Sequence, residues 1–114
     1  MKAYTDIEQS KKLAKFLPIK SADMRFCFSH TLSGRIIGHY PMIGREPSSG
    51  TIPCWSLAAL FNTLPKIVNL ETLFVETSPS LWHIGYRNVY TARATNLVDA
   101  AFEMIVWLKE NGKI

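Results

Sequence analysis

Two cysteines and three histidines are the side chains of this sequence best suited to act as metal ligands or nucleophiles: Cys27, Cys54, His30, His39 and His83. Metal ligands usually come in pairs a few residues apart, whereas the two nearest histidines are nine residues apart. Cys27 and His30 are closer, but they span the end of a predicted strand. We therefore predict no metal and no cofactor.

A cysteine nucleophile paired with a histidine remains open, because such pairs form in space and not in sequence. Cys54 opens an apolar segment predicted to be helical, and a helix N-terminus lowers a thiol pKa. The alternative is that both cysteines are small buried hydrophobes. The sequence contains neither Gly-x-Ser-x-Gly nor a glycine-rich phosphate loop. A cysteine-dependent enzyme is accordingly the third hypothesis.

Positive charge is concentrated in the first half of the chain. Residues 1–50 carry eight Lys and Arg against four Asp and Glu, while residues 51–114 carry five of each. The predicted surface for an anionic partner consists of Arg25, Arg35, His39 and Arg45. Aromatic residues lie close to these positions, and the combination is typical of nucleic-acid binding. The alternative is that the aromatic residues belong to the core.

The last predicted helix begins after Asn96, a good N-cap, and runs to about Glu110 or Asn111. One face of its helical wheel is apolar and the opposite face is acidic. Three apolar residues fall outside the apolar face: Phe102, Val106 and Trp107. We predict that they form a protein-contact surface, either for a second copy of the chain or for another protein.

The first predicted helix runs from about Asp6 to Phe16 or Leu17, with Thr5 and Glu8 as a capping box. Its lysines, Lys11, Lys12 and Lys15, are interpreted as a solvated face, with Glu8 placed to pair with Lys12. A very apolar second helix is predicted over Cys54 to Leu64.

Strands are predicted at Met24 to Phe28, Arg35 to Tyr40 and Leu70 to Thr77, and in a hairpin over Trp82 to Ala94, with a loop over Pro41 to Gly50. Together these elements predict a single α+β domain in which about three helices pack on a small, mostly antiparallel sheet.

The 114 residues are 47% apolar and 19% charged, which suits one globular domain and excludes a disordered or collagen-like chain. The longest apolar runs have five residues, too few to span a bilayer, and no apolar export signal follows Met1. We therefore expect a soluble cytoplasmic protein with reduced thiols and no membrane contact.

Several segments resemble parts of uncharacterised small proteins from bacterial phages and mobile elements. These segments are Tyr4 to Leu13, Ser21 to Met24, Ile52 to Leu60 and Asp99 to Ile105. A weaker resemblance links Tyr90 to Leu108 with the end of HicB-like antitoxin domains. Neither resemblance implies an activity or a functional residue. With no catalytic motif found, we expect a non-catalytic accessory or protein-interaction protein, and the alternative is a weak nucleic-acid-binding protein.

Overall fold

Residues 2–30, 32–33, 35–43 and 51–114 are described by a computed structural model, in which they form three α-helices and two antiparallel sheets. The helices are α1 (Ile7–Ala14), α2 (Leu57–Thr63) and α3 (Leu97–Glu110), with a short 3-10 helix at Ile19–Ser21. The first sheet has the order β2-β1-β3 and contains β1 (Met24–His30), β2 (Ile36–Ile43) and β3 (Ile52–Cys54). The second contains β4 (Ile67–Val68), β5 (Glu71–Thr77), β6 (Trp82–Tyr86) and β7 (Tyr90–Ala94) in that order. The α+β class is confirmed, but the strands form two sheets where one was expected.

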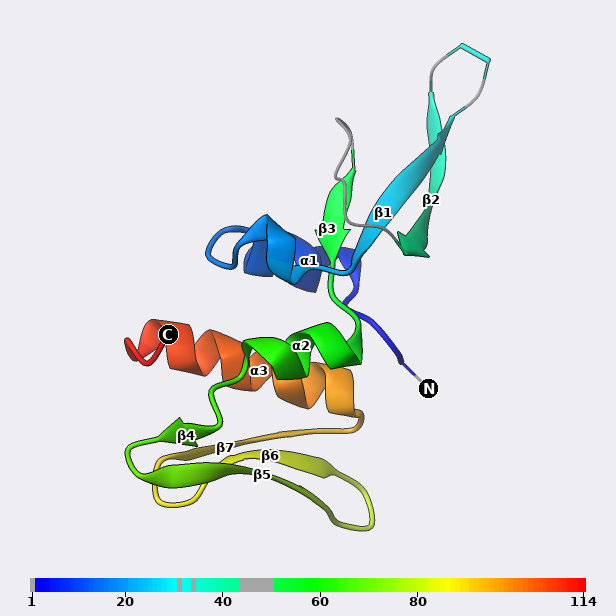
Figure 1. The fold of residues 1–114 in the computed structure, drawn as a ribbon. Helices are drawn as coiled ribbons and strands as arrows, with labels where there is room; N and C mark the ends of the chain where they lie inside the picture. The colour runs from blue at the N-terminus through cyan, green and yellow to red at the C-terminus, as the bar shows by residue number, and fades with distance from the viewer. Residues whose placement is uncertain (1, 31, 34, 44–50) are drawn as a thin grey trace.

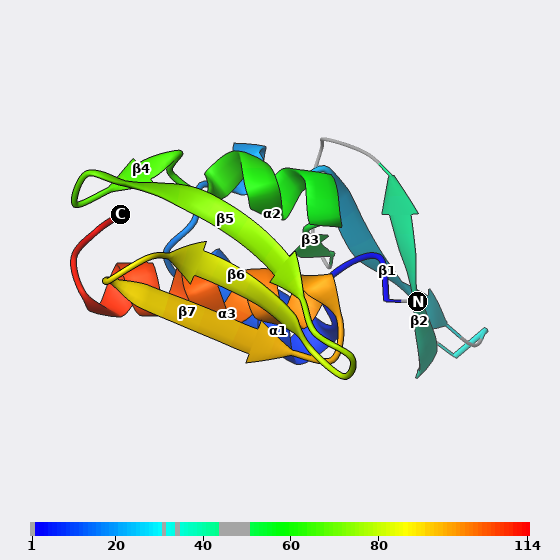
Figure 2. The same ribbon diagram turned by 90° about the horizontal axis from the view of Figure 1, so that it is seen from below.

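The four-stranded sheet, the pair α2 and α3, and helix α1 form three successive layers (Figure 1 and Figure 2). Helices α2 and α3 cover one face of the sheet, and α1 lies on the other side of α3. Strands β1 and β2 form a hairpin that extends away from the helices, and β3 pairs with β1 at the hairpin's base (Figure 1).

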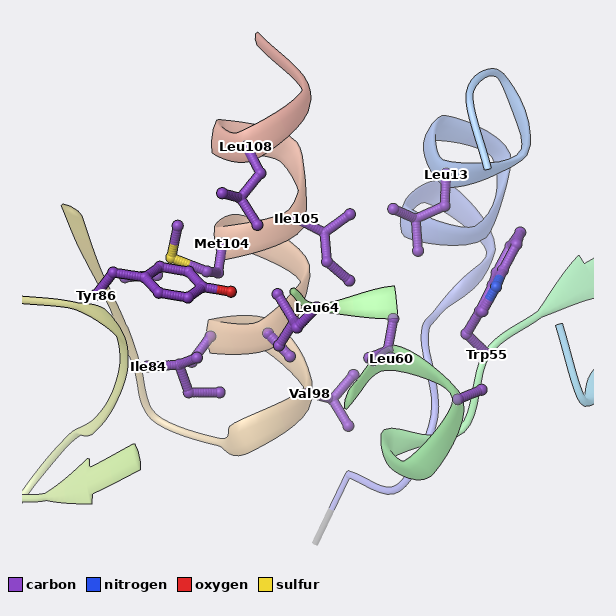
Figure 3. Packing of buried hydrophobic residues seen from close by; sticks show 14 of the residues in the cluster. Leu13, Trp55, Leu60, Leu64, Ile84, Tyr86, Val98, Met104, Ile105 and Leu108 are labelled. Atoms are coloured by element: carbon purple, nitrogen blue, oxygen red, sulfur yellow. The ribbon is translucent and has the colours of Figure 1, made fainter. Parts of the chain in front are cut away.

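Helix α3 supplies the centre of the core. Six of its residues are buried: Val98, Ala100, Ala101, Met104, Ile105 and Leu108. Leu13 and Trp55 lie at one end of the cluster, and Ile84 and Tyr86 lie at the other (Figure 3). Each large apolar side chain buried in this way contributes about 1.5–3 kcal/mol to folding. The cluster therefore joins all three layers and holds α1 and α3 in fixed positions.

Helix α1 begins one residue later than the capping pattern predicts. Asp6 is the N-cap: its carboxylate accepts from the Gln9 N–H at 2.8 Å, and the Gln9 side-chain oxygen accepts from the Asp6 N–H at 3.1 Å. Thr5 is fully buried, where its hydroxyl hydrogen-bonds to Ser10 at 2.8 Å and accepts from the Trp55 N–H at 3.1 Å. The Thr5–Glu8 capping box is therefore wrong, because tertiary contacts take up the Thr5 hydroxyl.

Cys54 ends strand β3 and does not open the second helix. It pairs with Met24 across the first sheet, and α2 begins only after Ser56. The Ser56 hydroxyl accepts from the Ala59 N–H at 3.2 Å, while the Asp23 carboxylate accepts from the Ser56 N–H at 2.9 Å and from its hydroxyl. An unbroken apolar run does not distinguish a buried strand from a buried helix, which explains the error.

Strand β2 continues through Pro41 to Ile43, into the stretch predicted as a loop, and residues 44–50 of that loop lie outside the described residues. Pro41 is tolerated because β2 is an edge strand of its sheet. Pro53 is tolerated for the same reason, because β3 is the edge strand on the other side. The later strands match their predicted positions closely, and the two-residue strand β4 is an addition.

The N-terminus of α3 is tied to the N-terminus of α1 through Asp99. Asn96 caps α3 as predicted, accepting from the Asp99 N–H at 2.9 Å. The Asp99 carboxylate in turn accepts from Lys2 Nζ at 2.7 Å, Gln9 Nε2 at 2.8 Å and Asn96 Nδ2 at 2.8 Å. Partial burial disfavours the charged carboxylate, but these hydrogen bonds outweigh it and lower the pKa of Asp99.

We expect Asp99→Asn to lower the free energy of unfolding at neutral pH by about 1 kcal/mol, because the charge-assisted bond to Lys2 weakens. A carboxyl group with a lowered pKa stabilises the fold above its unfolded-state pKa of about 3.8, and this contribution disappears as the pH falls through the folded-state pKa. Urea unfolding of the unchanged protein and of Asp99→Asn at pH 7 and at about pH 2 measures this. The difference between their free energies of unfolding should be smaller at the acidic pH. A difference of equal size at both pH values would contradict this role, and Glu76→Gln, at an exposed ion pair with Arg87, is the control.

Candidate functional site

A groove of about 780 Å³ lies between helices α1 and α3. We call it the α1–α3 groove. Its apolar lining consists of Phe16, Phe102 and Val106, and its basic lining consists of Lys11, Lys12, Lys15 and Lys109. Glu8, Gln9 and Glu110 complete the lining. The groove thus combines an apolar floor with a rim that carries more ammonium groups than carboxylates.

The α1 side of the groove follows from how this helix is anchored. Ser10 and Leu13 are buried beneath α1, so the lysines on the opposite side are directed away from the core and are exposed. The helix ends at Ala14, and Phe16 follows it as a half-buried side chain at the end of the groove. Lys109 Nζ lies 6.0 Å from the centre of the Phe16 ring, at the limit of a cation–π contact.

The α3 side of the groove is a stripe of residues spaced by four. Phe102, Val106 and Glu110 succeed one another along α3, and this spacing places them on one side of the helix. The adjoining face, with Ala101, Ile105 and Leu108, is buried in the core. Phe102 and Val106 are consequently half-buried, with one side against the protein and the other open to the groove.

A second hollow of about 320 Å³ continues the groove toward strand β7. It shares Lys12, Phe102, Val106 and Glu110 with the first hollow and adds Glu103, Tyr90 and Trp107. The Tyr90 and Trp107 rings are stacked, with centroids 4.7 Å apart and planes at 5°. The structure therefore places all three residues of the predicted protein-contact surface on one continuous depression, and their role as a contact surface stays a prediction.

The two helices that form the groove run in the same direction. Gln9 contacts Asp99 near both N-termini, and Phe16 contacts Lys109 near both C-terminal ends. Both helix dipoles thus place partial negative charge at the Lys15 end of the groove. Within the described residues, none of the four groove lysines forms an ion pair, and the expected Glu8–Lys12 pair is absent. Their ammonium groups are accordingly available to an external anion.

Three of the four residues predicted to bind an anionic partner belong to the β1–β2 hairpin. Arg25 is in β1 opposite Met42, His39 is in β2 opposite Phe28, and Arg35 is exposed just before β2. Arg45 lies outside the described residues. None of the three described positions lines the α1–α3 groove, and a common surface formed by the four residues stays a prediction.

The two cysteines are free and differ in their surroundings. Cys54 is fully buried, and burial raises the pKa of its thiol despite hydrogen bonds with Thr5 and Ser10. Such a thiol is protonated at neutral pH and closed to a substrate. Cys27 is half-buried with its Sγ 3.5 Å from the Met42 sulfur. The geometry therefore gives Cys54 none of the features of a nucleophile.

Among the described residues, no three His, Cys, Asp or Glu side chains gather as they would around a metal ion. No described helix has both the length and the apolar character needed to cross a bilayer. This chain matches no protein-family model, no curated protein and no solved structure.

Sequence analysis found the α3 side of the groove and missed the α1 side. The sequence pattern of α1 indicates only a solvated face for its lysines, and Phe16 is predicted only as a candidate end of the helix. The available signal was that an aromatic residue ends a lysine-rich helix, while another helix carries apolar residues outside its buried face. Nothing in the sequence indicates that these two features, about ninety residues apart, lie side by side.

Proposed function

We propose that this chain is a small non-catalytic accessory protein that binds a partner protein through the α1–α3 groove. The observation that carries the proposal is an apolar floor, Phe102 and Val106, beside ammonium groups that form no ion pair with any described residue. Apolar residues at the centre of a contact and charged residues at its rim are the usual arrangement of a protein interface. The resemblance of several segments to small phage proteins supports a phage or mobile-element origin.

Site-specific photo-crosslinking in the producing cell tests this proposal. A photoreactive residue at Lys12 or Glu110, one on each side of the groove, is expected to give a covalent adduct with a different protein. Both positions are exposed, so the replacement leaves the core intact. The same residue at Lys66, which is exposed and does not line the groove, is the matched control.

The expected adduct disappears when Val106 is replaced by arginine, because a charge then occupies the apolar floor. Equal adducts at Lys66 and Lys12 would overturn the proposal. An adduct made only of two copies of this chain would also overturn it, since the groove would then serve self-association.

A second candidate function is weak nucleic-acid binding by the β1–β2 hairpin. Residues 24–43 contain two arginines and two histidines and no Asp or Glu, and the hairpin extends from the body (Figure 1). A two-stranded ribbon of this kind fits the major groove of DNA. Fluorescence anisotropy with a short duplex should then show affinity at low salt that falls steeply as salt rises. Affinity that ignores salt, or that survives Arg35→Glu unchanged, would contradict this candidate.

A further inference from the structure

We infer that the occupant of the α1–α3 groove is an amphipathic helix of the partner, with acidic residues in its first turn, lying antiparallel to α1 and α3. This inference rests on the proposed function and names the chemistry of its partner. Three features of the groove support it: its length, the direction of its two walls and the position of its charges.

The length and shape of the groove fit a short helix. Its α1 wall runs from Glu8 to Lys15, which corresponds to about 12 Å or two helical turns. The α3 wall, from Phe102 to Glu110, has the same length, and its two apolar residues, Phe102 and Val106, are one turn apart. A helix that lies in such a groove inserts apolar side chains spaced by three or four residues. We therefore expect two apolar anchors, one turn apart, on the partner helix.

The direction of the walls favours an antiparallel occupant. Because α1 and α3 run in the same direction, the partial negative charges of their C-terminal ends lie together near Lys15 and Lys109. The N-terminus of an antiparallel helix brings partial positive charge to this end, whereas a parallel helix would bring a third negative end. The dipole interaction alone is modest, so the charged side chains must supply most of the preference.

The charged side chains point to the same orientation. Lys12, Lys15 and Lys109 lie in the second half of the groove with one carboxylate, Glu110, so this half is net positive. In the first half Lys11 is accompanied by Glu8, and Glu103 lines the adjoining second hollow. Acidic side chains in the first turn of an antiparallel helix would meet these lysines, and such residues also stabilise the helix that carries them. Acidic side chains in its last turn would instead face Glu8 and Glu103.

Two synthetic peptides of about 14 residues and identical composition test the inference. Each carries two leucines one turn apart; one has its glutamates in the first turn and the other has them in the last. By fluorescence anisotropy at low salt, we expect the acid-first peptide to bind about tenfold more tightly, which corresponds to about 1.4 kcal/mol. Its affinity should fall as salt rises, because the contacts are partly solvated. Equal affinities for the two peptides would overturn the inferred orientation.

Charge reversal on the protein locates the binding site. Lys12→Glu with Lys15→Glu should weaken the acid-first peptide about tenfold, whereas Lys66→Glu, an exposed lysine outside the groove, should leave its affinity unchanged. Equal weakening by both changes would overturn the inference. The replaced side chains are exposed, so circular dichroism should show the same helix content in all variants.

The two proposals fail in different ways. If neither peptide binds while the photoreactive groups at Lys12 and Glu110 still capture a protein, the acidic-helix inference is overturned and the proposed function stands. If these groups capture nothing beyond the Lys66 control, the proposed function is overturned, and tight peptide binding would not rescue it.

Discussion

Trp55→Ala is expected to lower the free energy of unfolding by about 3–5 kcal/mol, a large part of the total stability of a small domain. The Trp55 side chain is completely buried at one end of the cluster, beside Leu13 of α1 and Leu60 of α2 (Figure 3). Its removal leaves a cavity at the contact between two layers, which neither helix can fill without moving. The Trp55 indole N–H also donates to the Ser21 hydroxyl at 3.0 Å, and this hydroxyl would lose a partner.

Two further substitutions show whether the loss of stability in Trp55→Ala is specific to this buried position or follows from removing any tryptophan ring. Trp55→Phe retains most of the ring volume and removes the indole N–H, so we expect it to cost about 1–2 kcal/mol. Trp82→Ala, at a half-buried position, is the matched control and should cost less than Trp55→Ala. Urea unfolding followed by circular dichroism measures all three. A cost below about 1 kcal/mol for Trp55→Ala would contradict the packing described here.

The burial of Trp55 also determines the groove. Its backbone N–H donates to the Thr5 hydroxyl, and its carbonyl accepts from the Thr5 N–H at 2.9 Å, so the segment before α1 is fixed to the segment before α2. Leu13 and the N-terminal Gln9–Asp99 contact then fix the rest of α1 against α3. Trp55→Ala keeps these backbone bonds but removes the side chain packed in the same cluster as Leu13. We therefore expect it to loosen α1 and to weaken peptide binding as well as stability, although Trp55 does not line the groove.

The sequence predicted those parts of the fold whose signals are local. Helix α3 is predicted correctly because Asn96 caps it and its apolar face repeats regularly, and in the structure Gly112 follows its end with a φ of +67°. The β6–β7 hairpin was found from alternating residues around a turn at Arg87 and Asn88. Helix α1 begins one residue later than predicted and strand β3 is not predicted at all, because the decisive interactions are tertiary. Thr5 loses its capping role to contacts with Ser10 and Trp55, and Cys54 becomes a strand residue through pairing with Met24.

The candidate site, too, has one side that local sequence signals predict and one side that depends on tertiary contacts. Phe102, Val106 and Trp107 were identified because a helical wheel reveals apolar residues outside the buried face. The wheel of α1 gives its lysines no comparable signal, since a lysine face is equally well explained by solvent. Their role in a groove depends on the distance between α1 and α3, which is fixed by the packing of Leu13 and the Asp99 contacts. Half of the site is thus a property of tertiary packing and has no local signature.

Gly85→Ala is the second change with a large expected effect, and it acts on the opposite side of α3. Gly85 lies in β6, between β5 and β7, opposite Thr91. A Cβ atom added there would lie 2.3 Å from the Tyr90 carbonyl oxygen and 2.7 Å from the Thr91 Cα. Both are backbone atoms, so the clash can be relieved only by moving β7 away from β6. We expect a loss of about 3 kcal/mol in the free energy of unfolding.

Gly38→Ala provides the matched control, because Gly38 is also a strand glycine and a Cβ added there meets nothing within 4 Å. Its effect should be close to zero or slightly stabilising, since alanine loses less backbone freedom on folding. Thermal unfolding followed by circular dichroism distinguishes the two variants, and equal melting temperatures would contradict the close approach at Gly85.

A displaced β7 would also carry Tyr90 away from Trp107, so the stacked pair beside the groove would open. Trp107 fluorescence, isolated in a background with Trp55→Phe and Trp82→Phe, should then change in the Gly85→Ala protein and remain unchanged in Gly38→Ala. This result would show that the four-stranded sheet shapes the binding surface through β7, although only Tyr90 of that strand lines the second hollow.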